Sequence, residues 1–306
     1  YIGCVLVDYL IKNNVKTSSI DSLVYNQDQI NKHNNNTYYE FFKIDIRSKD
    51  IFKFDFSIYD KIIILAGLVG DPITKKYPDQ SININENGII DLIEHVSKKN
   101  KHHILFISTC SNYGLIEDDI YADENFDLNP LSLYAESKVK VENYLINNQN
   151  INFTILRFAT AFGLSQRMRF DLTLNEFTKD LYLNKKLEVY DPDTWRPYCH
   201  VIDFARLIYI IIQSDIRKVG NQVFNAGSNI NNASKKDIVN MIQKKIPNTK
   251  VNYVKNGIDK RNYKVDFSKI KNELNYEPRY TIEDGVDEII KAFEDGLYED
   301  YLKNKA

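Results

Sequence analysis

Cysteine, glycine and proline are scarce in this sequence of 306 residues, and neither sign of charge is in marked excess. The three cysteines, Cys4, Cys110 and Cys199, are scattered and odd in number, which argues against a disulfide framework and fits a reducing cytoplasm. The net charge is only −2, so no broad positive field would attract nucleic acid or an anionic membrane. No apolar run approaches the roughly 18 residues of a membrane span. We therefore expect a cytoplasmic globular protein without nucleic-acid or membrane partners.

Histidine and cysteine also lack the spacing of a metal site, and we predict none. What the sequence does contain is an alternation of short apolar runs and helix-like stretches in its first half. We expect strands at residues 18–21, 38–44, 61–65, 103–107 and 153–158, and helices at residues 2–11, 82–98 and 133–145. Such alternation is typical of parallel strands covered on both faces. It predicts an α/β fold with a doubly wound, Rossmann-like parallel sheet, whose ligands bind beyond the carboxyl ends of the strands.

After about residue 165 the regular alternation of strand-like and helix-like stretches ends. We expect helices at residues 169–183, 234–245, 268–274 and 282–297, a loop running into a helix at 196–212, and a strand with a turn at 222–227. These elements predict a smaller, mostly helical lobe. We assign residues 1–165, with about 199–228, to the sheet domain, and residues 166–198 and 229–306 to the second lobe.

Two residues near the start suggest a dinucleotide site. Gly3 opens an apolar helix, and glycine at such a place lets a pyrophosphate approach the amides of a helix N-terminus. Asp21 ends the next expected strand, where a carboxylate that binds ribose would fall. A helix-packing glycine and a turn acid would give the same pattern, so this signal is open to both interpretations.

The centre of the chain carries a more specific pattern. Residues 108–114, Ser-Thr-Cys-Ser-Asn-Tyr-Gly, follow a buried strand and present hydroxyl groups at the sheet edge. About twenty residues later comes Tyr134-Ala-Glu-Ser-Lys138. Positions i and i+4 share a helix face, so the phenol of Tyr134 would lie near the ammonium of Lys138. A nearby cation favours phenolate and lowers the pKa of a tyrosine. An exposed helical pair is the alternative, but the hydroxyl-rich strand end favours proton transfer.

Along nearly its whole length the chain resembles the extended short-chain dehydrogenase/reductase family, the NAD-dependent sugar-nucleotide epimerases and dehydratases. Tyr1-Ile-Gly3 is similar to the end of that family's glycine-rich turn, so we expect the first strand and two further glycines to lie upstream of residue 1. The other matching segments follow in order: Asp21, Asp45-Ile46, Leu65-Ala-Gly67, Asn85-x-x-Gly88, residues 108–114, Tyr134-x-x-x-Lys138, residues 156–158 and residues 196–203.

The resemblance implies NAD as the cofactor and a nucleotide-sugar as the substrate. Cofactor contacts would come from Ile2, Gly3, Asp21, Asp45, Ile46, Ala66, Gly67, Tyr134 and Lys138. Asp21 favours NAD over NADP, because its carboxylate would repel a 2′-phosphate. The sheet domain would bind NAD and the second lobe the substrate. We also expect a homodimer.

The resemblance also implies the roles of the catalytic residues. Tyr134 would exchange the proton of a sugar hydroxyl while hydride moves to or from the nicotinamide, Lys138 would hold the ribose and tune Tyr134, and Thr109 would orient the hydroxyl. Arg196 would pair with a substrate phosphate, and Arg261 is a second phosphate ligand or a surface arginine. Arg167 and Arg169 would contact phosphate or hydroxyls, or remain solvated.

One departure from the family's sequence pattern reduces the number of reactions that the protein could catalyse. The family's 4,6-dehydratases carry an Asp-Glu pair after the catalytic threonine, whereas Cys110 and Ser111 stand here. Dehydration is therefore disfavoured, and we interpret Cys110 as a packing residue. We predict an oxidoreductase or epimerase that acts at C4 of the sugar. The alternatives are a one-way 4-dehydrogenase or 4-ketoreductase and an inactive NAD-binding sensor. Residues 66–72 and 165–171 resemble a branch of bacterial sugar-nucleotide oxidoreductases that includes GDP-heptose 4-dehydrogenases.

Overall fold

A parallel sheet of four strands forms the centre of the computed structural model, which describes residues 1–25, 32–33, 35–99, 102–117, 119–255 and 261–299. The strand order is β10–β6–β4–β3, built from β3 (Lys61–Ile64), β4 (His103–Thr109), β6 (Asn152–Phe158) and β10 (Gln222–Ala226). All neighbours in this sheet run parallel. A separate parallel pair joins β1 (Thr17–Asp21) to β2 (Tyr39–Lys43).

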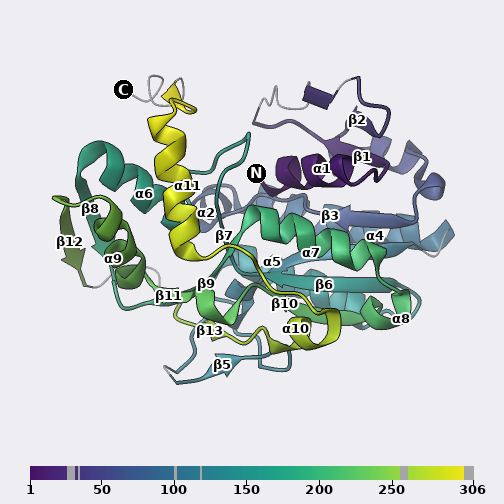
Figure 1. The fold of residues 1–306 in the computed structure, drawn as a ribbon. Helices are drawn as coiled ribbons and strands as arrows, with labels where there is room; N and C mark the ends of the chain where they lie inside the picture. Colours follow the sequence, from purple (N-terminus) through teal and green to yellow (C-terminus); the bar gives the residue numbers. More distant parts are fainter. Residues whose placement is uncertain (26–31, 34, 100–101, 118, 256–260, 300–306) are drawn as a thin grey trace.

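Helices cover both faces of this sheet (Figure 1). The side chains of β4 accordingly alternate between two apolar cores, one on each face. Leu105 and Ile107 pack in one core with residues of α1 (Ile2–Lys12) and α7 (Val201–Gln213). Ile104 and Phe106 pack in the other core with residues of α4 (Gly88–Lys99) and α5 (Leu133–Ile146). A strand buried on both faces reads as a continuous apolar run, as residues 104–107 in the middle of β4 do. The predicted doubly wound α/β fold is confirmed.

The remaining elements of the sheet region are short. They are the 3₁₀ turns η2 (Lys49–Lys53), η3 (Phe56–Ile58) and η5 (Cys110–Tyr113), the helices α2 (Asp71–Lys76), α3 (Pro78–Ile82), α8 (Ile216–Val219) and α10 (Ser268–Leu274), and the parallel pair β5 (Tyr121–Ala122) and β13 (Lys264–Val265).

The second lobe lies to the left of the sheet in Figure 1 and has its own apolar core. Its helices are α6 (Thr173–Asn184), α9 (Lys235–Lys245) and α11 (Ile282–Glu294), which bury Leu181, Ile242 and Ile289 together. A parallel pair, β8 (Lys186–Tyr190) and β12 (Lys250–Val254), flanks them. Between the lobe and the main sheet lies a three-stranded sheet in the order β11–β9–β7, formed by β7 (Thr160–Phe162), β9 (Trp195–His200) and β11 (Asn232–Ser234), with η6 (Asn229–Asn231) before β11.

Several boundaries differ from the sequence prediction. Residues 196–200 belong to strand β9 rather than to a loop, and α6 begins at Thr173 rather than at 169. The side chains of Arg169 and Asp171 pair with each other just before that helix. The lobe also contains β8 and β12, which the sequence analysis missed because only alternate residues of β8 are buried. The proposed domain boundaries stay a prediction.

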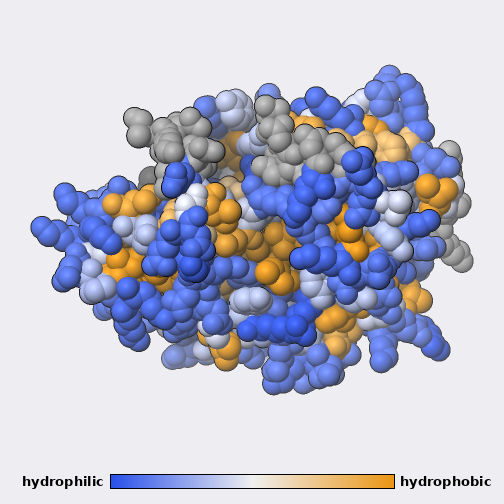
Figure 2. Space-filling view, turned by 45° about the horizontal axis from the view of Figure 1, so that its top comes forward, coloured by the Kyte–Doolittle hydropathy of each residue, from blue (hydrophilic) through white to orange (hydrophobic). Residues whose placement is uncertain are grey.

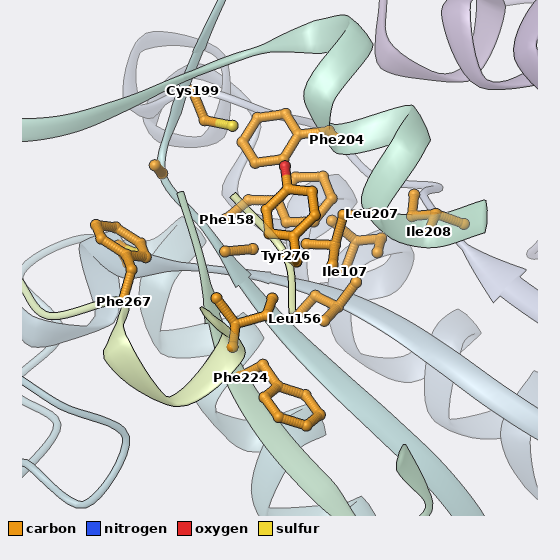
Figure 3. Close-up of a cluster of buried hydrophobic side chains, with 14 of the residues drawn as sticks. Ile107, Leu156, Phe158, Cys199, Phe204, Leu207, Ile208, Phe224, Phe267 and Tyr276 are labelled. Carbon is orange, nitrogen blue, oxygen red and sulfur yellow. The ribbon is translucent and has the colours of Figure 1, made fainter. Parts of the chain in front are cut away.

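Aromatic packing joins the sheet to α7 and to the segment before α11 (Figure 3). The rings of Phe158 and Phe204 stack with centroids 3.8 Å apart and planes 3° from parallel. Tyr276 is buried beside them, and its hydroxyl donates to the carbonyl of Asp203 at 2.9 Å. This core therefore fixes the C-terminal segment against the strand that follows α5.

The outer surface is mostly polar on the face drawn in Figure 2, where hydrophobic residues emerge in patches between hydrophilic ones. Among the residues that the structure describes, no helix has the length and the apolar character needed to cross a membrane.

The expected helix at residues 82–98 is interrupted by a π-helical turn, η4 (Asn83–Asn87). Asn85 is fully buried in this turn and holds the loop after β3. Its Oδ1 accepts from the amide of Leu68 at 2.7 Å, and its Nδ2 donates to the carbonyl of Leu68 at 2.8 Å. Such turns are often found at functional sites. The clamp fixes the loop that starts at the carboxyl end of β3.

We predict that Asn85→Ala lowers the free energy of unfolding by about 1–3 kcal/mol, because it leaves buried amide and carbonyl groups of Leu68 without partners. Urea denaturation measures this change. Asn87→Ala is the matched control in the same turn, where the exposed side chain only donates to Asn83. The control should change the free energy by less than about 0.5 kcal/mol. Equal effects of both substitutions would contradict the stabilising role of the hydrogen bonds between Asn85 and Leu68.

Candidate active site

Lys138 lies in the interior of the protein, on the face of α5 that packs against β4. Its side chain is only 2% exposed, and Nζ donates to the carbonyl of Ile107 at 2.7 Å. The same Nζ lies 4.6 Å from the centre of the Phe106 ring and 5.8 Å from the centre of the Tyr134 ring. The two side chains of the i, i+4 pair therefore lie near each other, with Lys138 buried and Tyr134 half-buried.

Burial changes the acidity of this lysine. Removal from water lowers the pKa of Lys138 to about 8, and the negative charge of Glu142 opposes part of that shift. An ammonium whose pKa is about 8 is still mostly charged at neutral pH. Lys138 can therefore act as a cation next to Tyr134 near neutral pH, and it can lose that charge in mildly alkaline solution.

Thr109 ends β4 and is followed by the turn η5, so its hydroxyl lies at the carboxyl edge of the sheet. Its Oγ1 accepts from the amide of Ser111 at 3.1 Å and lies 2.8 Å from the Oγ of Ser111. Helix α5 packs against both β4 and η5. The fold thus brings the element that carries Thr109 against the helix that carries Tyr134 and Lys138.

Cys110, between these two hydroxyl residues, is 1% exposed and belongs to the apolar core. Burial raises the pKa of its thiol well above the usual range. A buried thiol that stays protonated is a poor nucleophile and a poor acid–base group. These properties agree with the interpretation of Cys110 as a packing residue.

The first residues of α1 and the loop after β3 lie side by side. A Cβ built on Gly3 would meet only Leu65, at 4.0 Å, so the glycine is not crowded by protein. At Gly67 the same Cβ would come within 2.9 Å of Asn85, so a side chain is excluded there. Ile2 begins α1, and Ala66 precedes Gly67 in the loop.

The two predicted cofactor-binding acids lie beyond the ends of neighbouring strands. Asp21, the last residue of β1, is exposed, and its Oδ1 accepts from the amide of Leu23 at 2.7 Å. Asp45, just after β2, forms two hydrogen bonds with the side chain of Arg47, at 2.9 and 2.6 Å. This pairing lowers the pKa of Asp45. Ile46 packs near Gly88, as a Cβ on that glycine would come within 3.4 Å of it.

These residues fit a dinucleotide. The uncrowded glycine at the start of α1 leaves room near amides that point out of the helix, and such amides suit a pyrophosphate. The exposed carboxylate of Asp21 suits the hydroxyls of a ribose. Both lie at the carboxyl-terminal side of parallel strands, where ligands of doubly wound sheets bind.

Arg196 contacts the backbone at Arg261, the second candidate phosphate ligand. Arg196 is 7% exposed, and its Nη1 donates to the carbonyls of Trp195, at 2.7 Å, and of Arg261. Its guanidinium also lies 4.8 Å from the centre of the Tyr263 ring. One nitrogen of the Arg196 guanidinium therefore holds the backbone of the segment at Arg261.

Arg167 and Arg169 contact different parts of the protein. Arg167 stacks over the ring of Tyr25 at 3.9 Å, which places it near the segment after β1. Arg169 pairs with Asp171, and its Nη2 would lie 3.6 Å from a Cβ on Gly70. Burial alone would lower the pKa of Arg169, but Asp171 and, more weakly, Tyr134 and Tyr1 raise it. Arg169 is therefore close enough to Tyr134 for their charges to interact.

The sequence analysis assigned no role to a buried polar cluster behind these residues. Its centre is the ion pair of Glu142 on α5 with Arg157 on β6, whose Oε2 and Nη2 are 2.8 Å apart. Glu142 also accepts from Ser108 and Asn112, next to Thr109. The sequence signal was available, because Glu142 follows Lys138 by one helical turn and Arg157 interrupts an apolar strand.

Comparison with known proteins connects these features to a family. The family model described as "NAD dependent epimerase/dehydratase family" matches residues 1–227. The UDP-glucuronate 4-epimerase of Thermodesulfobacterium geofontis is 25% identical to this chain over 302 residues, which cover 94% of this chain and 91% of that protein.

Solved structures agree on the fold. The UDP-glucuronic acid 4-epimerase from Bacillus cereus, in complex with UDP-glucuronic acid and NAD, aligns with a TM-score of 0.86 at 23% identity over 96% of each chain. The dTDP-glucose 4,6-dehydratase from Bacillus anthracis, in complex with NAD, aligns with a TM-score of 0.84 at 23% identity over 96% of this chain and 94% of that chain. The predicted family is confirmed, and its description names NAD as the cofactor on which the family depends. The chain belongs to the NAD-dependent epimerase/dehydratase family.

Proposed function

We propose that this protein is an NAD-dependent oxidoreductase or epimerase that acts at C4 of a nucleotide-linked sugar. The observation that carries the proposal is the buried ammonium of Lys138 beside Tyr134, on a helix packed against the strand that ends at Thr109. This arrangement combines a proton-transfer group, a cation that tunes it and a hydroxyl that orients the substrate.

In the proposed reaction Tyr134, as phenolate, takes the proton from the C4 hydroxyl while the C4–H bond breaks and a ketone forms. The positive charge of Lys138 favours the phenolate before this step. Thr109 hydrogen-bonds the same hydroxyl and fixes its direction toward Tyr134. In an epimerase the ketone is reduced from its other face, and Tyr134 returns the proton to the oxygen.

Bound NAD would supply the acceptor and donor of the hydride. The amides at Ile2 and Gly3 would face its pyrophosphate, and Asp21 would bind the adenosine ribose. Ala66 and Gly67 would form the wall of the groove, with Asp45 and Ile46 beside the adenine. Lys138 would bind the nicotinamide ribose. The carboxylate of Asp21 disfavours a 2′-phosphate, so NAD rather than NADP is the proposed form.

The proposed substrate is a UDP-sugar, since relatives and structural neighbours include UDP-glucuronate 4-epimerases. Arg196 and Arg261 would bind its phosphates, because guanidinium groups pair well with phosphate oxygens. Arg169 is close enough to Tyr134 for an electrostatic interaction, so it would contact the sugar or its phosphate near the reacting carbon. Arg167, which stacks on Tyr25, would contact a part of the substrate farther from the reacting carbon than Arg169 does.

Dehydration is not part of the proposal, although a 4,6-dehydratase is among the structural neighbours. Cys110 is buried in the core with a raised pKa, and Ser111 is hydrogen-bonded to Thr109. Neither provides the carboxyl pair that expels water. A one-way 4-dehydrogenase or 4-ketoreductase remains the alternative within the same chemistry, and an inactive sensor is the alternative outside it. We also propose that the protein is a cytoplasmic homodimer.

We predict that Tyr134→Phe lowers kcat at least about 100-fold, because the substitution removes the group that exchanges the proton. The measurement is conversion of UDP-glucuronate and other UDP-, GDP-, dTDP- and CDP-sugars, together with calorimetric NAD binding, which should persist. Tyr144→Phe on the same helix is the control and should keep the wild-type rate. Undiminished turnover in Tyr134→Phe would refute the mechanism.

We further predict that kcat falls as the pH rises through about 8. Because burial lowers the pKa of Lys138 to about 8, its ammonium is lost there, whereas an exposed lysine keeps its proton to about pH 10.4. A pH–rate profile at saturating substrate measures the fall. Lys140→Gln, which removes an exposed lysine of the same helix, should leave the profile unchanged. A rate that stays constant to about pH 10 would contradict the role of Lys138.

A further inference from the structure

Glu142 is a fully buried carboxylate that joins three elements of the fold. Oε1 accepts from Asn112 Nδ2 at 2.8 Å and from Ser108 Oγ, both at the end of β4 or in the turn after it. Oε2 accepts from Arg157 of β6, at 2.8 Å from Nη2 and 3.1 Å from Nε. The carboxylate thus binds α5 to the carboxyl end of β4 and to β6 at the same time.

The position of Glu142 along α5 relates it to the proposed catalytic pair. Tyr134, Lys138 and Glu142 are spaced four residues apart, so all three lie along one face of the helix. Ser108, to which Glu142 is hydrogen-bonded, directly precedes Thr109. Any shift of Glu142 would therefore change the distance between the helix that carries Tyr134 and the strand that carries Thr109.

Arg157 compensates the charge of this carboxylate. It is 5% exposed at its side chain, and Nη1 also donates to Tyr113 Oη at 2.9 Å and to the carbonyl of Glu124 at 3.1 Å. Burial alone would lower the pKa of Arg157, but Glu142 and Tyr113 raise it, so the guanidinium stays charged. Glu142 and Arg157 form a buried pair whose other hydrogen-bonding groups are also satisfied.

We propose that Glu142 is a positioning residue for the C4 reaction: it holds Thr109 against the face of α5 that carries Tyr134, and its charge keeps Lys138 in the ammonium form. Arg157 sets how much of that charge Lys138 experiences. The inference rests on the proposed function, since it assigns Glu142 a role in the same proton transfer. Glu142 acts through Lys138 and Thr109 and needs no contact with the substrate.

The pKa of Lys138 supports this assignment. Burial lowers it to about 8, and Glu142 is the group that raises it against that effect. Tyr113 and Cys110 of η5 have raised pKa values and remain neutral near pH 8. The other charged or titratable groups on the elements that pack against α5 include Glu86 of η4, which binds Lys140, Glu94 of α4, which lies near Tyr144, and His103 of β4, which binds Thr154. Further such groups are Asp91, His95 and Lys98 of α4 and the exposed Lys75, Lys76 and Asp79 of α2 and α3.

Glu142→Gln tests the proposal because glutamine keeps the shape of the side chain and removes its charge. With that charge absent and Arg157 uncompensated, Lys138 should lose its proton more easily. We expect the alkaline fall in kcat to move about one pH unit lower, with little change in KM. Glu136→Gln, at an exposed position of the same helix, is the matched control and should leave the pH profile where it is.

Arg157→Gln provides the opposite test. It leaves Glu142 negative and removes the compensating cation, so the alkaline fall should move to higher pH. Loss of packing alone would not shift the two variants in opposite directions. Should Glu142→Gln fail to fold, Glu142→Asp keeps the charge on a shorter side chain, and we then expect a lower kcat with the alkaline fall still near pH 8.

A readout without turnover separates the inference from the proposed function. In protein labelled with ¹³C at the lysine Cε and free of cofactor, the Lys138 resonance, assigned with Lys138→Arg, should titrate near pH 8 in wild type, at lower pH in Glu142→Gln and at higher pH in Arg157→Gln. Unchanged titration and pH profiles in both variants would overturn the role of Glu142. If instead Tyr134→Phe retains full turnover while the titrations shift as expected, the proposed function fails and the electrostatic coupling stands.

Discussion

The contact between the buried ammonium of Lys138 and the carbonyl of Ile107 is the interaction on which the rest of the site depends. A charged amine is costly to remove from water, so it is tolerated only where carbonyl oxygens, aromatic faces or anions replace the solvent. Ile107, the ring of Phe106 and the nearby Glu142 do this here. The packing that buries Lys138 also sets its acidity, because desolvation is the cause of its lowered pKa.

The second lobe is held over this region by interactions at the start of α7. Asp203 is fully buried, and its Oδ2 accepts from the amides of Arg279 and Tyr280 at 2.9 and 3.0 Å. His200 caps the N-terminus of the same helix, and its Nε2 lies 2.8 Å from a carboxylate oxygen of Glu288 on α11. Strand β9, which carries Arg196, ends at His200 and is followed directly by the helix that carries Asp203. A rigid link between the lobe and the sheet therefore fixes the phosphate-binding candidates relative to Tyr134.

The sequence predicted the doubly wound fold and the shared helix face of Tyr134 and Lys138 because both leave local patterns: apolar strands between helices, and a four-residue spacing on one helix. The burial of Lys138 was not predicted, since it depends on the packing of α5 against β4. It missed β8, whose exposed residues alternate with buried ones, and it placed the strand β9 in a loop. The sequence analysis also did not predict the π turn at Asn85, because Asn85 is held there by hydrogen bonds to Leu68, seventeen residues away in sequence. Glu142 and Arg157 each leave a local signal, a spacing of one helical turn from Lys138 and a charge inside an apolar strand, but their pairing depends on the meeting of α5 and β6. The roles assigned to the site residues stay predictions.

The most direct test of the central claim is the absorbance of reduced nicotinamide in the NAD-loaded protein after mixing with UDP-sugars. An epimerase that oxidises C4 should show a transient reduced cofactor in wild type and none in Tyr134→Phe, with the sugar product inverted at C4 and no net consumption of NAD. A one-way dehydrogenase would instead accumulate NADH in proportion to substrate loss. Calorimetric binding of both NAD and a sugar nucleotide without any reduction of the nicotinamide would contradict the account.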